Sequence, residues 1–279
     1  MKLAFSTNAY KQETLEGAIE SIAGLGYAGV ELMADVPHAY PRDMDGRRIG
    51  EVRKRLEKLG VPISNVNAFT HFAAGDTYHP TWIEEEDALV RVRVEHTKHV
   101  IRMAGELGGG GGGTISLQPG GPLWPEDAGR RARALEKFRA GLEEVLPAAE
   151  ACGVTLLVEP EPGLLIQRAS ECVAFLRNVN HPRLKMNADL GHFFCVGDDP
   201  AAVVKEYAAW IGHVHLEDIG KNRVHQHLVP GQGAMDWAGI FAALRAADYA
   251  GWLTVELYPF ERTAEEAARE AERFLRGYL

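Results

Sequence analysis

Two features of the sequence predict a single α/β domain, a (β/α)₈ barrel over residues 1–279. Short apolar or β-branched runs alternate with longer helical patterns along the whole chain, as is typical of βα units around a parallel sheet. Eight such units fit into 279 residues, a length at which α/β barrels form one domain. A doubly wound open sheet normally uses fewer strands, so the barrel is the better interpretation.

The predicted strands are eight runs of buried-strand length, each apolar or rich in β-branched residues. They are Leu3–Thr7, Gly29–Leu32, Pro62–Asn67, Thr114–Leu117, Thr155–Glu159, Leu184–Asp189, Gly212–Leu216 and Leu253–Leu257.

Amphipathic segments with apolar residues at helical spacing lie between these runs and are expected to form the outer ring. They include Leu15–Leu25, Ile49–Leu59, Glu84–Leu107, Ala132–Cys152 and Ala264–Leu279. Several end in glycine before the next strand, as in KLGVPISNV and ACGVTLLVE, and glycine readily closes a helix in a left-handed conformation. The run Gly108–Gly113 lacks the GK[ST] ending of a phosphate-binding loop, so it is interpreted as a flexible connector.

Composition narrows the range of partners. The chain is 46% hydrophobic and 25% charged, with 30 basic and 39 acidic side chains and a formal charge of -9. This charge repels a polyphosphate, so no nucleic-acid partner is expected. The three cysteines Cys152, Cys172 and Cys195 form no disulfide framework, which favours the cytoplasm. The start MKLAFSTNAY lacks the apolar core of a signal peptide, and no membrane contact is expected.

Four successive predicted strands place an acid or an imidazole at their C-terminal ends, where catalytic groups of such barrels lie. A single acid there is usually a helix cap or a solvated loop residue. Clustered carboxylates, however, repel one another unless a cation compensates them. One divalent ion is therefore expected, with Mn²⁺ as the first choice and Mg²⁺, Co²⁺ or Zn²⁺ as alternatives. The expected ligands are Glu159, Asp189, His215 and Glu256.

Further histidines surround this set. His213 and His215 lie two apart on one strand and share a face, so spacing alone does not choose between them. His215 is preferred as the ligand because it is nearer the strand end, which leaves His213 as a hydrogen-bonded core residue. His225 and His227 form either a second metal pair or part of a polar loop over the site. The aromatic side chains Trp124 and Phe193 are candidates for stacking on the ring of a substrate at the barrel mouth, with core packing as the alternative.

The ordered motifs SxNAY, VEP, ADLGH, HVHLED, PGQGAMDW and TVELYPF together resemble the xylose isomerase-like barrel superfamily over nearly the whole chain. That superfamily includes sugar isomerases, ketose 3-epimerases, inosose dehydratases and AP endonucleases. The resemblance implies that the four strand-end residues hold the metal. Because Glu159 and Glu256 are expected to face each other across such a site, they are expected to act as the acid/base pair while also binding the metal. The resemblance also implies a substrate or further-metal contact for His192. The other substrate-binding candidates are His71, His227 and Arg223.

Two departures separate the chain from AP endonucleases. The HPG motif of those enzymes appears here as Gln118–Pro119–Gly120, and their DxH motif appears as His225–Gln226–His227. A neutral amide is a poor ligand where an imidazole is required, so a trinuclear zinc site is not expected.

The leading hypothesis is a metal-dependent isomerase or epimerase that transfers a proton in a sugar or polyol through an enediolate. One alternative is a dehydratase or a carbon–glycoside-cleaving lyase on the same metal site. Others are an AP endonuclease-like phosphodiesterase and a non-catalytic sugar-binding subunit. The resemblance also implies a homo-oligomer.

Overall fold

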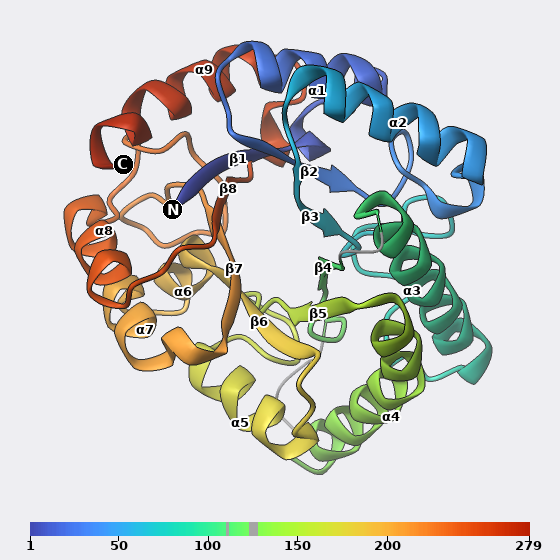
Figure 1. Cartoon of the computed structure of the whole chain (residues 1–279). Coiled ribbons are helices and arrows are strands. Elements are labelled where there is room, and N and C mark those ends of the chain that lie inside the picture. Colours follow the sequence, from blue (N-terminus) through green and yellow to red (C-terminus); the bar gives the residue numbers. More distant parts are fainter. Residues whose placement is uncertain (110–111, 123–127) are drawn as a thin grey trace.

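The computed structural model describes residues 1–109, 112–122 and 128–279, and the candidate Trp124 lies outside them. Eight parallel strands close into a barrel in the order β1 to β8, with the helices around it (Figure 1). Pairing of Lys2 with Trp252 and of Phe5 with Val255 joins β8 back to β1. The predicted single-domain (β/α)₈ barrel is confirmed.

Seven strands differ from the predicted runs by one or two residues at one or both ends, and β6 matches its run. They are β1 (Lys2–Ser6), β2 (Gly29–Met33), β3 (Ile63–Asn67), β4 (Gly113–Leu117), β5 (Val154–Val158), β6 (Leu184–Asp189), β7 (Ile211–Leu216) and β8 (Trp252–Val255). Two differences matter for the site, because Glu159 and Glu256 come directly after β5 and β8 rather than on them.

The helices are α1 (Leu15–Gly24), α2 (Gly46–Leu59), α3 (Asp87–Leu107), α4 (Ala128–Cys152), α5 (Ala169–Val179), α6 (Leu190–Cys195), α7 (Pro200–Tyr207), α8 (Trp237–Ala246) and α9 (Ala264–Leu275). All five helical segments named from the sequence are present. Helix α3 starts three residues later than predicted, since the Glu84 carboxylate accepts a hydrogen bond from the Thr81 backbone and belongs to the preceding turn. A 3-10 turn, Arg276–Tyr278, replaces the predicted end of α9.

Glycine is required where α2 and α4 end. Gly60 and Gly153 adopt φ values of 70° and 69°, in the left-handed region that glycine occupies without strain. Gly112 also has a positive φ, and a Cβ there would lie 2.5 Å from the Gly153 carbonyl oxygen. Of the predicted connector Gly108–Gly113, residues 110–111 are outside the described part of the chain.

A polar layer crosses the barrel interior, where branched apolar side chains usually dominate. Glu31 on β2 accepts a hydrogen bond from Asn65 on β3 at 2.8 Å, and Asn65 also donates to Ser116 on β4 at 3.0 Å. Across the barrel, the His213 ring lies 2.8 Å from Thr254 Oγ1. These residues are buried, so each polar group needs its partner, and the layer forms a rigid floor beneath the strand ends.

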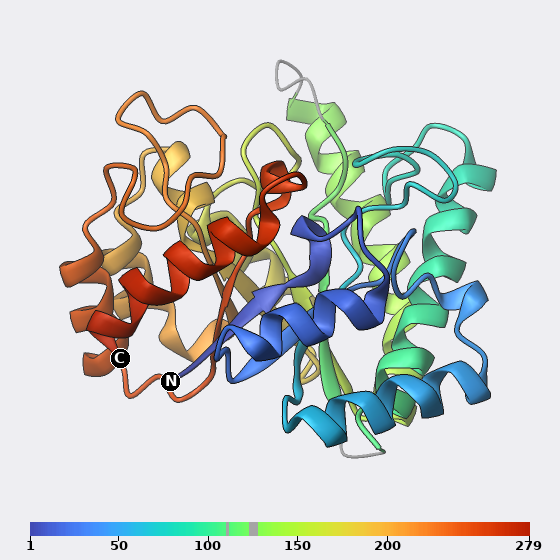
Figure 2. The ribbon, with the colours of Figure 1, turned by 90° about the horizontal axis from the view of Figure 1, so that it is seen from above.

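The longest loops gather at one end of the barrel. Figure 2 shows the loop after β7 (217–236, orange) and the loop after β3 (68–86, teal) on the same side of the molecule. This is the C-terminal end of the parallel strands, where active sites of such barrels lie. No helix in the described ranges is long and apolar enough to cross a membrane.

Candidate active site

The four strand-end residues predicted as ligands come together. Each of Glu159, Asp189, His215 and Glu256 offers one atom that lies within 4.8 Å of the corresponding atoms of the other three, and all four are buried. His215 Nδ1 is 2.9 Å from Glu159 Oε1 and 3.8 Å from Glu256 Oε1. The barrel fixes the two glutamates, since their backbone amides donate to Leu117 and Leu216 and so extend the strand ladders. The cluster has the donor set of a divalent metal site.

Unpaired oxygen atoms in this cluster fit a cation. Glu159 Oε2 and Asp189 Oδ2 are buried and have no hydrogen-bond partner among the described residues. A buried carboxylate oxygen without a partner costs several kcal/mol as a rule of thumb, about as much as desolvating an ion, so a positive ligand would relieve the strain.

Protons compensate the charge in the metal-free cluster. Burial lowers the pKa of His215, but the surrounding carboxylates of Glu31, Glu159 and Glu256 outweigh it and raise that pKa well above its ordinary value. Burial also raises the pKa of Glu256 well above its ordinary value. Metal binding at this cluster therefore releases protons, because a divalent ion replaces the positive charge that they supply.

Glu31 orients the His215 imidazole from inside the barrel. Its Oε2 atom lies 2.7 Å from His215 Nε2, so that nitrogen donates to Glu31 and Nδ1 faces the other carboxylates. A carboxylate behind a metal-binding imidazole fixes the ring and raises its basicity. His213 lies deeper, against Thr254, and is the hydrogen-bonded core residue expected from its position.

A cavity of about 190 Å³ opens above the cluster. Glu159 and Glu256 line it, and the amide groups of Asn8 and Asn67 hold Glu256 Oε1 at 2.9 and 3.0 Å. This leaves Glu256 Oε2 without a side-chain amide donor. The volume is that of a small polyol rather than of a duplex nucleic acid. A larger hollow of about 760 Å³, lined by Arg53 and Ser64, lies at the opposite end of the barrel, away from the carboxylates.

Glu161 is a cavity residue that sequence reasoning missed. Its Oε1 atom accepts a hydrogen bond from the Tyr78 hydroxyl at 3.0 Å, and burial raises its pKa to about 7. The sequence did contain a signal, because VEPEP places a second acid two residues after Glu159, and alternate residues of an extended segment share a side. The cavity thus holds a third carboxyl group that is poised between its two protonation states near neutral pH.

Glu217 was missed as well. Burial raises its pKa well above its ordinary value, and the neighbouring Asp189 carboxylate raises it further, so this carboxyl group keeps its proton to higher pH than a free glutamate does. The Glu217 side chain explains why ADLGH has a glycine, because a Cβ at Gly191 would lie only 1.6 Å from Glu217 Oε1.

His192 and His227 lie beside the cluster. Asp189 Oδ1 caps helix α6 by accepting from the His192 amide at 2.8 Å, and this cap sets the position of His192. The His192 ring lines the cavity. Burial lowers the pKa of His227 to about 4 and that of His225 to about 2, so both are neutral imidazoles.

The loop that carries His225 and His227 is anchored by Asp218. Its carboxylate accepts hydrogen bonds from the amides of Gly231 and Met235 at 2.8 and 3.2 Å, and from the Trp237 indole at 2.9 Å. A Cβ at Gly233 would lie 2.2 Å from Asp218 Oδ1, which accounts for the glycine of the GAMDW segment. The motif PGQGAMDW therefore holds a loop over the site.

Three other predicted substrate contacts are not among the residues that line the cavity. The His71 ring stacks on His96 at 4.0 Å, in a separate small hollow. Arg223 lies over the Phe194 ring at 4.6 Å and donates to the Phe194 carbonyl. Phe193 is fully buried in the core. The structure thus brings His192 and the strand-end cluster together without these three side chains.

Gln118 stands where the endonuclease HPG motif has its histidine, and its side chain forms hydrogen bonds outside the strand-end cluster. Its Nε2 donates to the backbone carbonyls of Tyr78 at 3.0 Å and Phe69 at 3.4 Å. With His71 turned towards His96, neither residue extends the strand-end cluster.

Comparison with known proteins places this geometry in a family. The model of the family described as "Xylose isomerase-like TIM barrel" matches residues 19–278. Inosose dehydratase of Clostridium perfringens is 26% identical over 265 residues, which cover 88% of this chain and 83% of the relative. The 2-oxo-tetronate isomerase of Cupriavidus necator is 28% identical over 258 residues, covering 90% of this chain and 89% of the relative.

Solved structures share the fold at lower identity. A D-tagatose 3-epimerase-like protein superposes with a TM-score of 0.81 at 19% identity, covering 100% of this chain and 97% of the other. The IolI protein, solved with a zinc atom bound, superposes with a TM-score of 0.80 at 18% identity, covering 100% of this chain and 98% of the other. Because the family model spans nearly all of the barrel, and because the buried acid and histidine cluster lies at its strand ends, the chain belongs to the xylose isomerase-like TIM barrel family.

Proposed function

We propose that this protein is a divalent-metal-dependent isomerase or epimerase that moves a proton next to the carbonyl group of a small sugar or polyol. The observation that supports this most is the position of two glutamates, Glu159 and Glu256, on the wall of one small cavity and within the same buried donor cluster. The relatives named above are a dehydratase and an isomerase of small polyhydroxylated substrates.

In the proposed reaction, a bound divalent ion supplies polarisation of the substrate carbonyl, with Mn²⁺ as the first choice. One glutamate removes the proton on the adjacent carbon, and the other returns a proton to another face or atom. Glu256 Oε2 is suited to this role, because Asn8 and Asn67 hold only Oε1. The protons of the two glutamates are coupled, so their apparent pKa values belong to the pair.

The walls of the cavity orient the substrate. Lys11 and the Tyr78–Glu161 pair supply hydrogen-bonding groups, while Phe69 and Phe72 supply apolar surface for the carbon face of a sugar. His192 and the neutral His225 are further hydrogen-bonding groups at the rim. In an isomerase or epimerase, these groups hold hydroxyl groups without breaking a carbon–oxygen bond.

A dehydratase or carbon–glycoside-cleaving lyase is the second candidate, favoured by Glu161. Elimination needs the same proton abstraction and then an acid that protonates the departing oxygen. Glu161 lies in the cavity with a raised pKa of about 7, and so holds a proton in part of the population at neutral pH. The similarity of this chain to inosose dehydratase also supports the dehydratase candidate.

Product analysis distinguishes the two reactions. Metal-replete protein is incubated with ketoses, keto-inositols and 3-keto-glycosides, and the products are identified by mass and NMR. An isomer or epimer of unchanged mass supports the proposal, whereas loss of water or of an aglycone supports the lyase. The control is Glu150→Gln, which removes an exposed carboxylate on α4 and should leave turnover unchanged. A metal-replete protein that binds sugar without converting any of these substrates would favour the binding subunit.

A further inference from the structure

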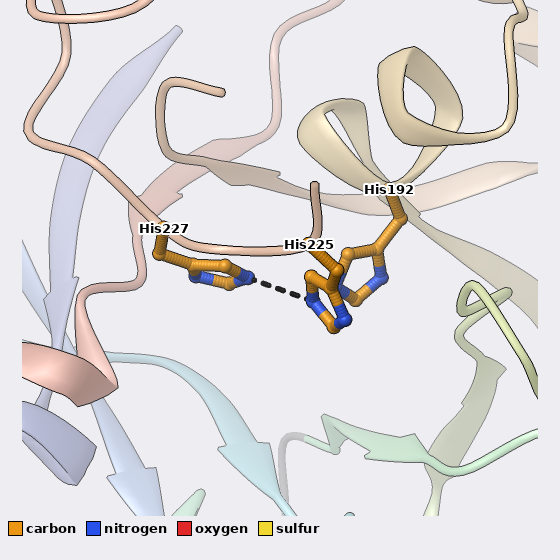
Figure 3. Close-up of side chains that lie close together, drawn as sticks. All are labelled: His192, His225 and His227. Carbon is orange, nitrogen blue, oxygen red and sulfur yellow. Dashed lines mark hydrogen bonds between the residues drawn. The ribbon is translucent and has the colours of Figure 1, made fainter. Parts of the chain in front are cut away.

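A pair of histidines, His71 and His96, lies apart from the strand-end cluster. At the cavity, Figure 3 shows ring nitrogens of His225 and His227 facing each other, 3.3 Å apart. His71 Nδ1 and His96 Nε2 are also buried, but they have no hydrogen-bond partner among the described residues. The centroids of their stacked rings are 4.0 Å apart. A buried polar atom without a partner is costly, so these two nitrogens point to a ligand from outside the chain.

The two rings line a hollow of about 100 Å³ between the loop after β3 and helix α3. Tyr40, Arg42 and His99 line it as well, and none of its lining residues carries a carboxyl group. The hollow is separate from the catalytic cavity, since the two share no lining residue. It has room for several water molecules, and hence for a carboxylate group or a tetrahedral oxyanion.

A buried arginine on α3 lacks a counter-charge. Arg93 is fully buried, and its guanidinium donates only to backbone carbonyl groups, at 2.7 Å to Pro80 and at 3.2 Å to Ala68 and Phe69. Its Nη2 has no hydrogen-bond partner, and no carboxylate pairs with it, in the part of the chain that the structure describes. Arginine is almost never fully buried unless it is paired, so its charge remains uncompensated.

This charge acts on both imidazoles. Burial lowers the pKa of His71 to about 4 and that of His96 well below its ordinary value, and the charges of Arg93 and Arg42 lower both further. The Asp35 carboxylate opposes the shift at His71 without cancelling it. The electrostatic potential at the two rings is therefore positive, which favours an anion over a metal ion.

We propose that this hollow binds a small oxyanion, a phosphate or a carboxylate group, through the imidazoles of His71 and His96 and the guanidinium of Arg42. Each neutral imidazole can donate one N–H to the anion. The Arg42 side chain is exposed and has no hydrogen bond or ion pair to a described residue, so its fork of donors can close over the anion. This inference does not depend on the proposed reaction.

The bound anion would lie behind a wall of the catalytic cavity. Thr70 and Phe72 line that cavity, whereas His71, between them in the sequence, lines the hollow. The anion would therefore add a contact to the segment that carries both cavity residues.

Titration calorimetry with inorganic phosphate tests the proposal. Metal-free protein is used, because an ion at the strand-end cluster would itself attract phosphate. Sodium acetate is titrated in parallel, with sodium chloride holding the ionic strength constant. The wild-type chain should bind one equivalent of phosphate or acetate saturably, and the anion that binds more tightly identifies the ligand as a phosphate or a carboxylate group.

Two variants locate the binding. Arg42→Gln removes an exposed charge, and His96→Phe keeps a ring against His71 but removes both nitrogens. Each should weaken anion binding by at least ~10-fold, the usual worth of a hydrogen bond to a charged group. The control Arg47→Gln removes an exposed arginine on α2 that pairs with Glu51, and should bind as the wild type does.

Three results would overturn the proposal. One is the absence of saturable binding with both phosphate and acetate. Another is an unchanged affinity in either Arg42→Gln or His96→Phe, with circular dichroism showing the fold intact. The third is an equal loss of affinity in Arg47→Gln, which would mean that the anion responds only to the overall charge of the surface.

Discussion

The two clusters at the mouth of the barrel are built in different ways. Glu159, Asp189, His215 and Glu256 follow or end strands of one closed sheet, so strand pairing fixes their spacing. His225 and His227 stand on a loop that the hydrogen bonds of Asp218 anchor, and the Glu256 carbonyl accepts a hydrogen bond from the His227 ring. A ligand set on strand ends is thus readable from motif order, whereas the placement of side chains on a loop depends on contacts that no local pattern reveals.

The largest expected effect separates the clusters by removing a strand-end ligand. Asp189→Asn keeps the cap on α6 but loses a carboxylate, and His215→Ala loses the imidazole. Each should weaken metal binding at the strand-end cluster by more than about 100-fold, because direct ligands outweigh outer partners. Isothermal titration with Mn²⁺ measures this, and circular dichroism checks the fold. Unchanged Mn²⁺ affinity in both variants would show that the ion binds elsewhere.

A smaller effect is expected from Glu31→Gln. The amide keeps the size of the side chain but removes the charge that orients His215 Nε2 at 2.7 Å. Mn²⁺ affinity should fall by roughly 10- to 100-fold, the usual cost of an outer-shell change. Circular dichroism checks that the fold is kept. A loss of the folded signal in this variant would mean that Glu31 acts through general destabilisation of the barrel.

The smallest expected effect is a change in the pH dependence of stability. The pKa of Glu161 rises on folding to about 7, so the native state holds a proton that the unfolded chain has released. This stabilisation is fully present below the ordinary glutamate pKa and is lost as pH rises through about 7. The Glu161→Gln side chain stays neutral at every pH. As pH rises from the ordinary glutamate pKa to about 7, the free energy of unfolding of this variant should therefore increase relative to that of the metal-free wild type, by at most ~1.4 kcal/mol per pH unit. Urea unfolding in the presence of a chelator, at several pH values, measures this difference. If the stabilities of the two proteins changed with pH in parallel, the raised pKa of Glu161 would be contradicted.

The sequence predicted more of the strand-end cluster than of its surroundings. The barrel and the clustering of four strand-end residues followed from the alternation of strands and helices and from motifs at strand ends, because periodicity and motif order are visible in a sequence. Glu31 and Glu217 carry no such signal. Glu31 lies within an apolar run on β2, and its partner His215 is 184 residues away. Glu217 follows His215 within HVHLED, where an acid normally meets solvent, and only the packing against Gly191 shows that it is buried.

For two loop residues, the sequence predicted substrate contacts, and the structure places their side chains away from the cavity. His71 and Arg223 were expected at the substrate because they follow strands β3 and β7. Their loops turn them towards His96 and Phe194 instead. A strand fixes the direction of its last side chain, but a residue several positions into a loop points where the loop's own hydrogen bonds send it.

Deuterium exchange tests the central claim, that Glu159 and Glu256 transfer a proton at the strand-end cluster. Substrate identified by product analysis is incubated with metal-replete protein in D₂O, and NMR follows deuterium at the carbon next to the carbonyl. The wild type should incorporate deuterium, and Glu159→Gln or Glu256→Gln should lower the rate by ~10²-fold or more, the usual worth of a positioned acid or base. Glu150→Gln should exchange at the wild-type rate. Turnover of a ketose without any deuterium uptake would contradict proton transfer.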